Sequence, residues 1–149
     1  MSNTHFSGPV ISTAGFQPGA SSYVSVTAAR TFTAADSGKT FGLNLVDGGA
    51  LTMPTAAAAG AGWKIRLRLE TAITTAWIAT FAAAEMAGNI GIVDIVTTVD
   101  GSFTAAGNVI TFTASAETVG DWCDIECNGS VFFVSGIANL TTGIALSGS

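Results

Sequence analysis

Two acidic side chains near the C-terminus have a spacing that could serve acid–base chemistry. Asp124 and Glu126 alternate with apolar residues between positions 123 and 127, which is typical of a strand with one polar face. On that face the two carboxyl groups would lie about 7 Å apart, and a pair of carboxyl groups can hydrolyse a glycosidic bond. Because Trp63 and Trp77 lie far away in the sequence, no sugar cleft is indicated, and we interpret the pair as part of a solvent-facing strand.

Other catalytic patterns are incomplete. The chain has a single histidine, His5, which excludes multi-histidine metal sites and most histidine-based triads. Gly38, Lys39 and Thr40 imitate the end of a phosphate-binding loop, but that loop requires a glycine where Thr33 stands and a helix afterwards. A strand is predicted there instead. We therefore expect no enzymatic activity and no cofactor.

The cysteines and the acidic loops indicate no metal site. In a strand, Cys123 and Cys127 would share a face about 13 Å apart, too far for a disulfide. No second ligand pair completes a zinc site. The loops at Asp47 and between residues 94 and 100 offer too few oxygen ligands for calcium. We expect two free, buried thiols, because an unpaired cysteine packs as a small hydrophobic residue.

Three basic side chains alternate with apolar ones along a predicted strand over residues 63–70: Lys64, Arg66 and Arg68. Two interpretations remain open for this basic ladder. It is either a solvated strand face or a binding surface, on which arginine pairs with carboxylates of a neighbouring subunit. In a symmetric oligomer Asp124 and Glu126 are the candidate partners.

Short strands recur along the chain, separated by turn residues. The pattern predicts strands at residues 23–27, 30–33, 39–45, 50–53, 63–70, 76–81, 90–99, 108–113, 121–127, 131–136 and 143–147. Residues 55–62 allow a turn or two of helix. Asn128-Gly129 between two β segments predicts a hairpin. The fold is therefore expected to be all-β, an antiparallel sandwich or barrel of jelly-roll-like form.

The first 20 residues differ from the rest. Glycine and proline interrupt any regular element there, yet four apolar side chains remain: Phe6, Val10, Ile11 and Phe16. We interpret residues 1–20 as an extended arm whose apolar side chains bind a partner, with a disordered tail as the alternative. Residues 21–149 are expected to form a single β domain.

The composition limits the possible partners. Charged residues make up 10% of the chain and the net charge is −5, which argues against nucleic acid, since phosphate binding depends on lysine and arginine. Neither a signal sequence nor a membrane span is predicted. The low charge indicates either a surface covered by other subunits or a neutral surface coated with threonine and serine.

Several short motifs are shared with a known family. They are Phe6-Ser7-Gly8-Pro9-Val10, Thr33-Ala34-Ala35-Asp36-Ser37-Gly38-Lys39-Thr40-Phe41, Leu51-Thr52-Met53-Pro54, Gly120-Asp121-Trp122, Asn128-Gly129 and Phe133-Val134-Ser135-Gly136. Together they resemble the β-rich head-decoration, or cement, proteins of tailed bacteriophages. The two cysteines depart from that family, which usually has apolar residues at these positions.

The resemblance implies a structural role in a virion. Such proteins sit on the outer surface of the capsid, bind the major capsid protein, and often associate with themselves as a homotrimer. Similar domains occur in phage tail fibres, so a tail-fibre or receptor-binding module is the alternative function. The resemblance implies neither nucleic-acid binding nor membrane binding.

Overall fold

The computed structural model describes residues 22–82, 84–93 and 102–148, and for residues 102–106 the backbone alone. Within these residues the chain forms twelve strands, one short α-helix and one 3₁₀ turn. The strands are β1 (Tyr23–Val26), β2 (Arg30–Thr31), β3 (Thr40–Leu43), β4 (Gly49–Thr52), β5 (Ala61–Leu69), β6 (Trp77–Thr80), β7 (Met86–Ile92), β8 (Ser102–Gly107), β9 (Val109–Phe112), β10 (Trp122–Asn128), β11 (Phe132–Ala138) and β12 (Ile144–Ser147). The helix is α1 (Ala56–Ala59), and the 3₁₀ turn is η1 (Ala34–Asp36).

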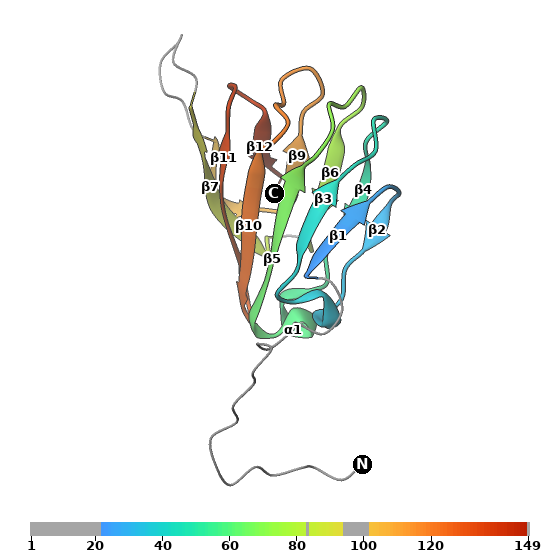
Figure 1. Cartoon of the computed structure of the whole chain (residues 1–149). Coiled ribbons are helices and arrows are strands. Elements are labelled where there is room, and N and C mark those ends of the chain that lie inside the picture. Colours follow the sequence, from blue (N-terminus) through green and yellow to red (C-terminus); the bar gives the residue numbers. More distant parts are fainter. Residues whose placement is uncertain (1–21, 83, 94–101, 149) are drawn as a thin grey trace, which may run out of the picture.

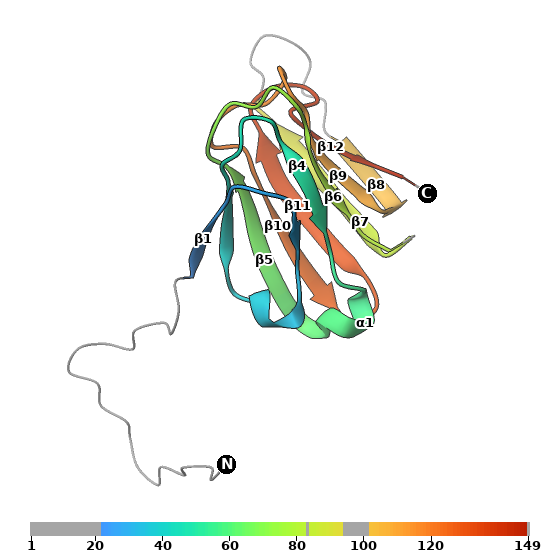
Figure 2. The same cartoon turned by 90° about the vertical axis from the view of Figure 1, so that its right-hand side faces the viewer.

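The strands form two sheets that pack face to face, with α1 at one end (Figures 1 and 2). A seven-stranded sheet has the order β1-β3-β5-β10-β11-β7-β8, and a five-stranded sheet has the order β12-β9-β6-β4-β2. The predicted all-β fold is confirmed, and its form is a sandwich of two layers.

The pairing within the sheets is mixed, whereas the sequence predicted antiparallel strands. The first six strands alternate between the two sheets, so β1, β3 and β5 are parallel neighbours in one sheet and β2, β4 and β6 are parallel neighbours in the other. Each passage from one layer to the other and back returns the chain in the same direction. This coiled path replaces the expected jelly-roll course.

After this coil most strand pairs are antiparallel, although β7 pairs with β11 in parallel. β10 pairs with β5, and β9 pairs with β6. β10 and β11 form the hairpin predicted at Asn128-Gly129. In its turn the Asn128 side-chain oxygen accepts hydrogen bonds from the backbone N–H groups of Ser130 (2.9 Å) and Val131 (2.8 Å), which is how asparagine stabilises tight turns.

The core lies between the sheets and follows the alternation of the sequence. In β5 the apolar side chains are buried and the basic ones are exposed, as predicted. The largest fully buried side chains come from both layers: Trp77, Phe32, Phe41, Phe112, Phe132, Leu43, Leu51, Leu67, Leu69, Met86, Ile90 and Ile110. The fold therefore has one continuous hydrophobic core.

Some element boundaries differ from the prediction. The strand expected over residues 90–99 runs from Met86 to Ile92, and residues 94–99 lie outside the described part of the chain. β8 was not predicted as a strand. The helical turn expected within residues 55–62 is α1, where Thr55 Oγ1 accepts a hydrogen bond from Ala58 N–H at 3.2 Å. No helix in the described part of the chain has the length and apolar character needed to cross a membrane.

Candidate interaction surface

The basic ladder lies on the outer face of the seven-stranded sheet, and two of its three members pair with carboxylates of the same chain. β10 runs beside β5 in a register that places Glu126 opposite Lys64 and Asp124 opposite Arg66. Lys64 Nζ lies 3.6 Å from Glu126. Arg66 donates two hydrogen bonds of 2.7 Å to the two oxygens of Asp124.

This pairing corrects one expectation. Asp124 and Glu126 were candidate partners for the ladder of a neighbouring subunit, but each already pairs with a base of its own chain. The antiparallel neighbour relation between β5 and β10 is the reason, because cross-strand neighbours of opposite charge attract each other. The two carboxylates therefore pair with two of the three bases of the ladder.

Arg66 makes a second contact that the sequence did not predict. Its guanidinium carbon lies 4.3 Å from the centre of the Trp122 ring, a distance typical of a cation–π interaction. The two hydrogen bonds to Asp124 raise the pKa of Arg66 further above its usual range. Because Arg66 covers a face of the indole ring, that face is closed to a stacked sugar.

Arg68 differs from the other four lysine and arginine residues of the chain. It is exposed and lies opposite Trp122. The other four each form an ion pair within the chain: Arg30, Lys39, Lys64 and Arg66. No ion pair joins Arg68 to a carboxylate among the residues that the structure describes.

Glu70 lies just beyond β5, two residues after Arg68, and receives hydrogen bonds from hydroxyl groups. Tyr23 Oη and Ser25 Oγ of β1 donate to its two carboxylate oxygens, the latter at 3.3 Å. Gly42 of β3 leaves the space for this contact, since a Cβ atom there would overlap both the Glu70 carboxylate and the Tyr23 hydroxyl. Glu70 has no cationic partner within the described residues.

Apolar side chains continue the surface next to Arg68. Trp122 is opposite Arg68 on one side and Ile137 of β11 on the other. Ile137 is 43% exposed, and Val119 and Val93 are 55% and 54% exposed. These residues line a shallow hollow at the end of β10. We call Arg68, Glu70, Val93, Val119, Trp122 and Ile137 the β5–β11 patch.

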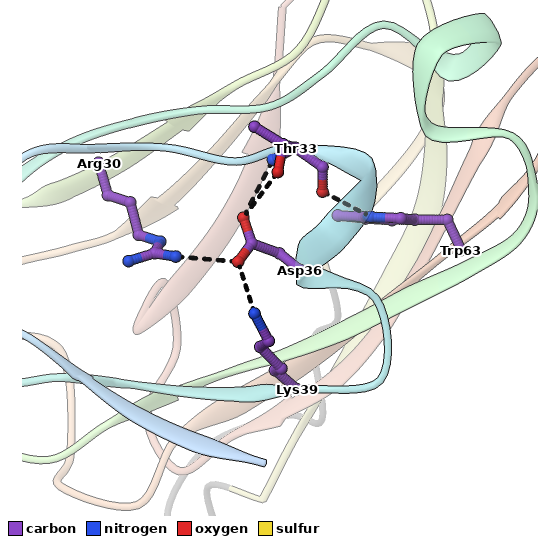
Figure 3. A network of polar contacts seen from close by, with 5 residues as sticks. All are labelled: Arg30, Thr33, Asp36, Lys39 and Trp63. Atoms are coloured by element: carbon purple, nitrogen blue, oxygen red, sulfur yellow. Dashed lines mark hydrogen bonds and ion pairs between the residues drawn. The ribbon is translucent and has the colours of Figure 1, made fainter. Parts of the chain in front are cut away.

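The motif from Thr33 to Phe41 has a structural role (Figure 3). Asp36 is 5% exposed, and its carboxylate accepts hydrogen bonds from Arg30 (2.9 Å), Lys39 (3.1 Å) and the Thr33 N–H (3.0 Å). The indole N–H of Trp63 donates to the Thr33 carbonyl at 3.0 Å. Lys39 is thus tied to a carboxylate, and strand β3 follows it, so this segment has no phosphate-binding loop.

The sequence carries a signal for this network. An acidic residue three positions after Thr33 is the pattern of a capping box, and it places Asp36 over the backbone N–H of Thr33. The sequence also contains a weaker indication of where Trp122 lies. Trp122 is two and four residues before Asp124 and Glu126, so in a strand all three side chains lie on the same, outward face of β10.

Both cysteines are free and buried on the inner face of β10, as predicted. The Cys127 sulfur accepts a hydrogen bond from the Gly129 N–H at 3.2 Å. Among the described residues no group of three or more histidine, cysteine or acidic side chains could hold a metal ion. The acidic loop at residues 94–100 and the apolar side chains Phe6, Val10, Ile11 and Phe16 lie outside the described residues.

The five-stranded sheet presents an outer face of a different kind. Its outward residues form two rows across the strands, and none of them is charged: Thr31, Ala50, Thr52, Ile78, Thr80, Val109, Thr111, Ala145 and Ser147. Ile78 is 43% exposed. We call these nine residues the neutral face.

Comparisons with protein-family models, curated proteins and solved structures found no match.

Proposed function

We propose that this protein is a structural component of a phage virion that binds the outer surface of the head and stabilises it. The observation that carries the proposal is the neutral face, an exposed sheet surface built from threonine, alanine and other uncharged residues. Such a surface loses little solvation of charge when a partner covers it, and the centres of protein interfaces are depleted in charge.

The motif resemblance to head-decoration proteins supplies the identity of the partner, the major capsid protein. A protein that binds the assembled shell but not its separated subunits stabilises the shell by mass action. Many copies on one particle add avidity where neighbouring copies also contact one another. In this role the charged residues serve to pair strands and no catalysis is required.

Immunogold labelling tests the location directly. An antibody raised against the purified chain is applied to intact phage particles that encode it, and the label is located by electron microscopy. Label over the head surface is the expected result. Label at the tail tip would instead support the receptor-binding alternative, and particles without label would contradict both.

A second measurement tests the neutral face itself. Threonine-to-lysine changes at Thr52 and Thr80, which are adjacent across β4 and β6, should abolish binding to isolated heads because they place two charges in the interface. A double change on the other sheet, at the exposed Ser135 and Asn89, which are adjacent across β11 and β7, is the matched control. Equal binding by both variants would contradict the assignment of the neutral face to the shell.

A further inference from the structure

The β5–β11 patch combines features that protein interfaces share. Tryptophan and arginine are enriched where interfaces gain most of their binding energy, and here Trp122 and Arg68 are direct cross-strand neighbours. Exposed Ile137 and Val119 extend the apolar area beside them. Exposed apolar side chains grouped beside a tryptophan and an arginine are the composition of interface centres.

The charges within the patch indicate what covers it. Arg68 has no carboxylate partner in the described part of the chain, and Glu70 receives only hydroxyl hydrogen bonds there. Both side chains point to the outer face, because Gly42 lies opposite Arg68 in β3 and beneath the Glu70 carboxylate. A base without an ion pair among the described residues and a carboxylate whose two oxygens accept only hydroxyl hydrogen bonds there thus lie two positions apart, about 7 Å along the strand direction.

This arrangement is self-complementary. A two-fold axis between two copies brings the same patch of each copy together, so that a residue i meets j while j meets i. Arg68 of one copy then meets Glu70 of the other, and the reverse pair forms at the same time. A single foreign partner would need to supply both an acid and a base at this spacing, whereas a second copy supplies them automatically.

We propose that the β5–β11 patch is a two-fold contact between two copies of this chain. Arg68 and Glu70 form two equivalent ion pairs across the axis, and Trp122, Val119 and Ile137 supply the apolar centre. This contact is separate from the proposed attachment to a capsid. It uses the seven-stranded sheet, whereas the neutral face lies on the five-stranded sheet. It predicts a dimer, whereas the motif resemblance implies a homotrimer.

Sedimentation equilibrium of the purified full-length chain measures the copy number. The expected mass is twice the 14.9 kDa of one chain. Ile137→Asp should shift the protein to monomer, because it places a carboxylate in the apolar centre of the contact. Ile78→Asp is the matched control: it is also a strand isoleucine with 43% exposure, but it lies on the neutral face and should leave the dimer intact.

Charge reversal tests the pairing itself. Arg68→Glu should weaken the dimer about tenfold or more, since it sets two pairs of carboxylates against each other. The double variant Arg68→Glu/Glu70→Arg should restore the affinity of the natural chain, because the two signs are again complementary across the axis. Reversal of the exposed pair Lys64 and Glu126 is the control and should have no effect.

Three outcomes would overturn the proposal: a monomer at every concentration, a trimer, or a dimer that Ile137→Asp leaves unchanged. Circular dichroism and the thermal midpoint identify any variant that fails to fold. If a single variant fails to fold, the dimer affinity of the folded double variant Arg68→Glu/Glu70→Arg decides whether the two ion pairs form. A dimer without head labelling would contradict only the capsid function. Head labelling by a monomer would contradict only the two-fold contact.

Discussion

At the scale of single residues, Asp36 connects three parts of the chain through one buried carboxylate. Burial alone would raise its pKa, but the Thr33 N–H and the two cations Lys39 and Arg30 outweigh this effect and hold the pKa of Asp36 below its usual value. The charged form is therefore favoured in the folded state. Removing the carboxylate leaves two cations and an N–H group without their partner.

We expect Asp36→Ala to lower the free energy of unfolding by about 1.5–3 kcal/mol, the range for hydrogen bonds to charged groups. Because the folded pKa of Asp36 is lowered, the advantage of the natural chain over the variant is present above the unfolded pKa of about 3.9. It disappears as the pH falls through the folded value. Urea unfolding at several pH values measures both effects. The exposed Asp47→Ala is the control, expected within about 0.5 kcal/mol.

Asp121 should show the opposite dependence on pH. It is 5% exposed and accepts hydrogen bonds from the N–H groups of Thr118 (2.9 Å) and Asn139 (3.0 Å). Burial, with a smaller effect of the charge of Glu117, outweighs these hydrogen bonds and raises the pKa of Asp121. Its ionisation therefore costs stability in the folded protein.

The natural chain should accordingly lose stability relative to Asp121→Asn as the pH rises through the folded pKa of Asp121. Below the unfolded pKa of about 3.9 the contribution of the protonated carboxyl group is fully present. The difference in free energy of unfolding between the two chains, followed from acidic to neutral pH, checks the sign. A difference that grows in favour of the natural chain on raising the pH would contradict the effect of burial.

The two thiols should be unreactive in the folded protein. Burial raises the pKa of the Cys123 thiol, and the neighbouring charge of Asp124 adds to this shift, while Cys127 is also buried. The thiolate is the reactive species, so we expect slow labelling by a thiol reagent in buffer and fast labelling of both residues in denaturant. A disulfide between residues 123 and 127 detected by mass spectrometry would contradict the strand.

At the scale of elements, the attachment of β1 to the sheet depends on a missing side chain. β1 is an edge strand, and Tyr23 reaches Glu70 across Gly42. The glycine is therefore required for close approach and not for an unusual backbone angle. Any larger residue at position 42 pushes the tyrosine and the glutamate apart.

We expect Gly42→Ala to destabilise the protein by about 1–3 kcal/mol through this overpacking. Faster hydrogen exchange should appear in β1 and β3 while β10 and β11 remain protected. Gly91→Ala is the matched control, since a Cβ atom at that strand position meets only the Gly136 carbonyl oxygen at 3.7 Å. Equal exchange in β1 for both variants would contradict the role of Gly42.

At the scale of the whole molecule, the two outer faces of the sandwich have different chemistry. The basic ladder and its carboxylates lie on the seven-stranded sheet, whereas the neutral face covers the five-stranded sheet. On our proposals, the first face contacts a second copy and the second face contacts the shell. In a particle coat, attachment and lateral association would each add to avidity.

The arm remains a prediction of the sequence. Deleting residues 2–18 should leave the thermal midpoint of the chain nearly unchanged, because β1 begins only at Tyr23, and should weaken binding to isolated heads. Differential scanning calorimetry and co-sedimentation with heads measure the two effects. If the shortened chain fails to fold, these residues belong to the core; if it binds heads as well as the full chain, attachment depends on other surfaces.

The sequence by itself determined the properties that depend on local periodicity. The alternation in residues 63–70 identified both the buried and the exposed side chains of β5, and Asn128-Gly129 fixed the hairpin of β10 and β11. A similar alternation in residues 123–127 placed both cysteines on the buried face of β10. These features follow from the two-residue period of a strand, which needs no knowledge of its neighbours.

Only the tertiary structure decided which strands are neighbours. Strand direction depends on whether the chain returns to the same sheet or crosses to the other, and the coiled path of β1 to β6 made the pairs parallel. The same choice put β10 beside β5, so that Arg66 met Asp124 in its own chain and Arg68 was left opposite Trp122. Strand pairing within a sheet joins residues far apart in sequence, and the two-residue period of one strand does not say which other strand lies beside it.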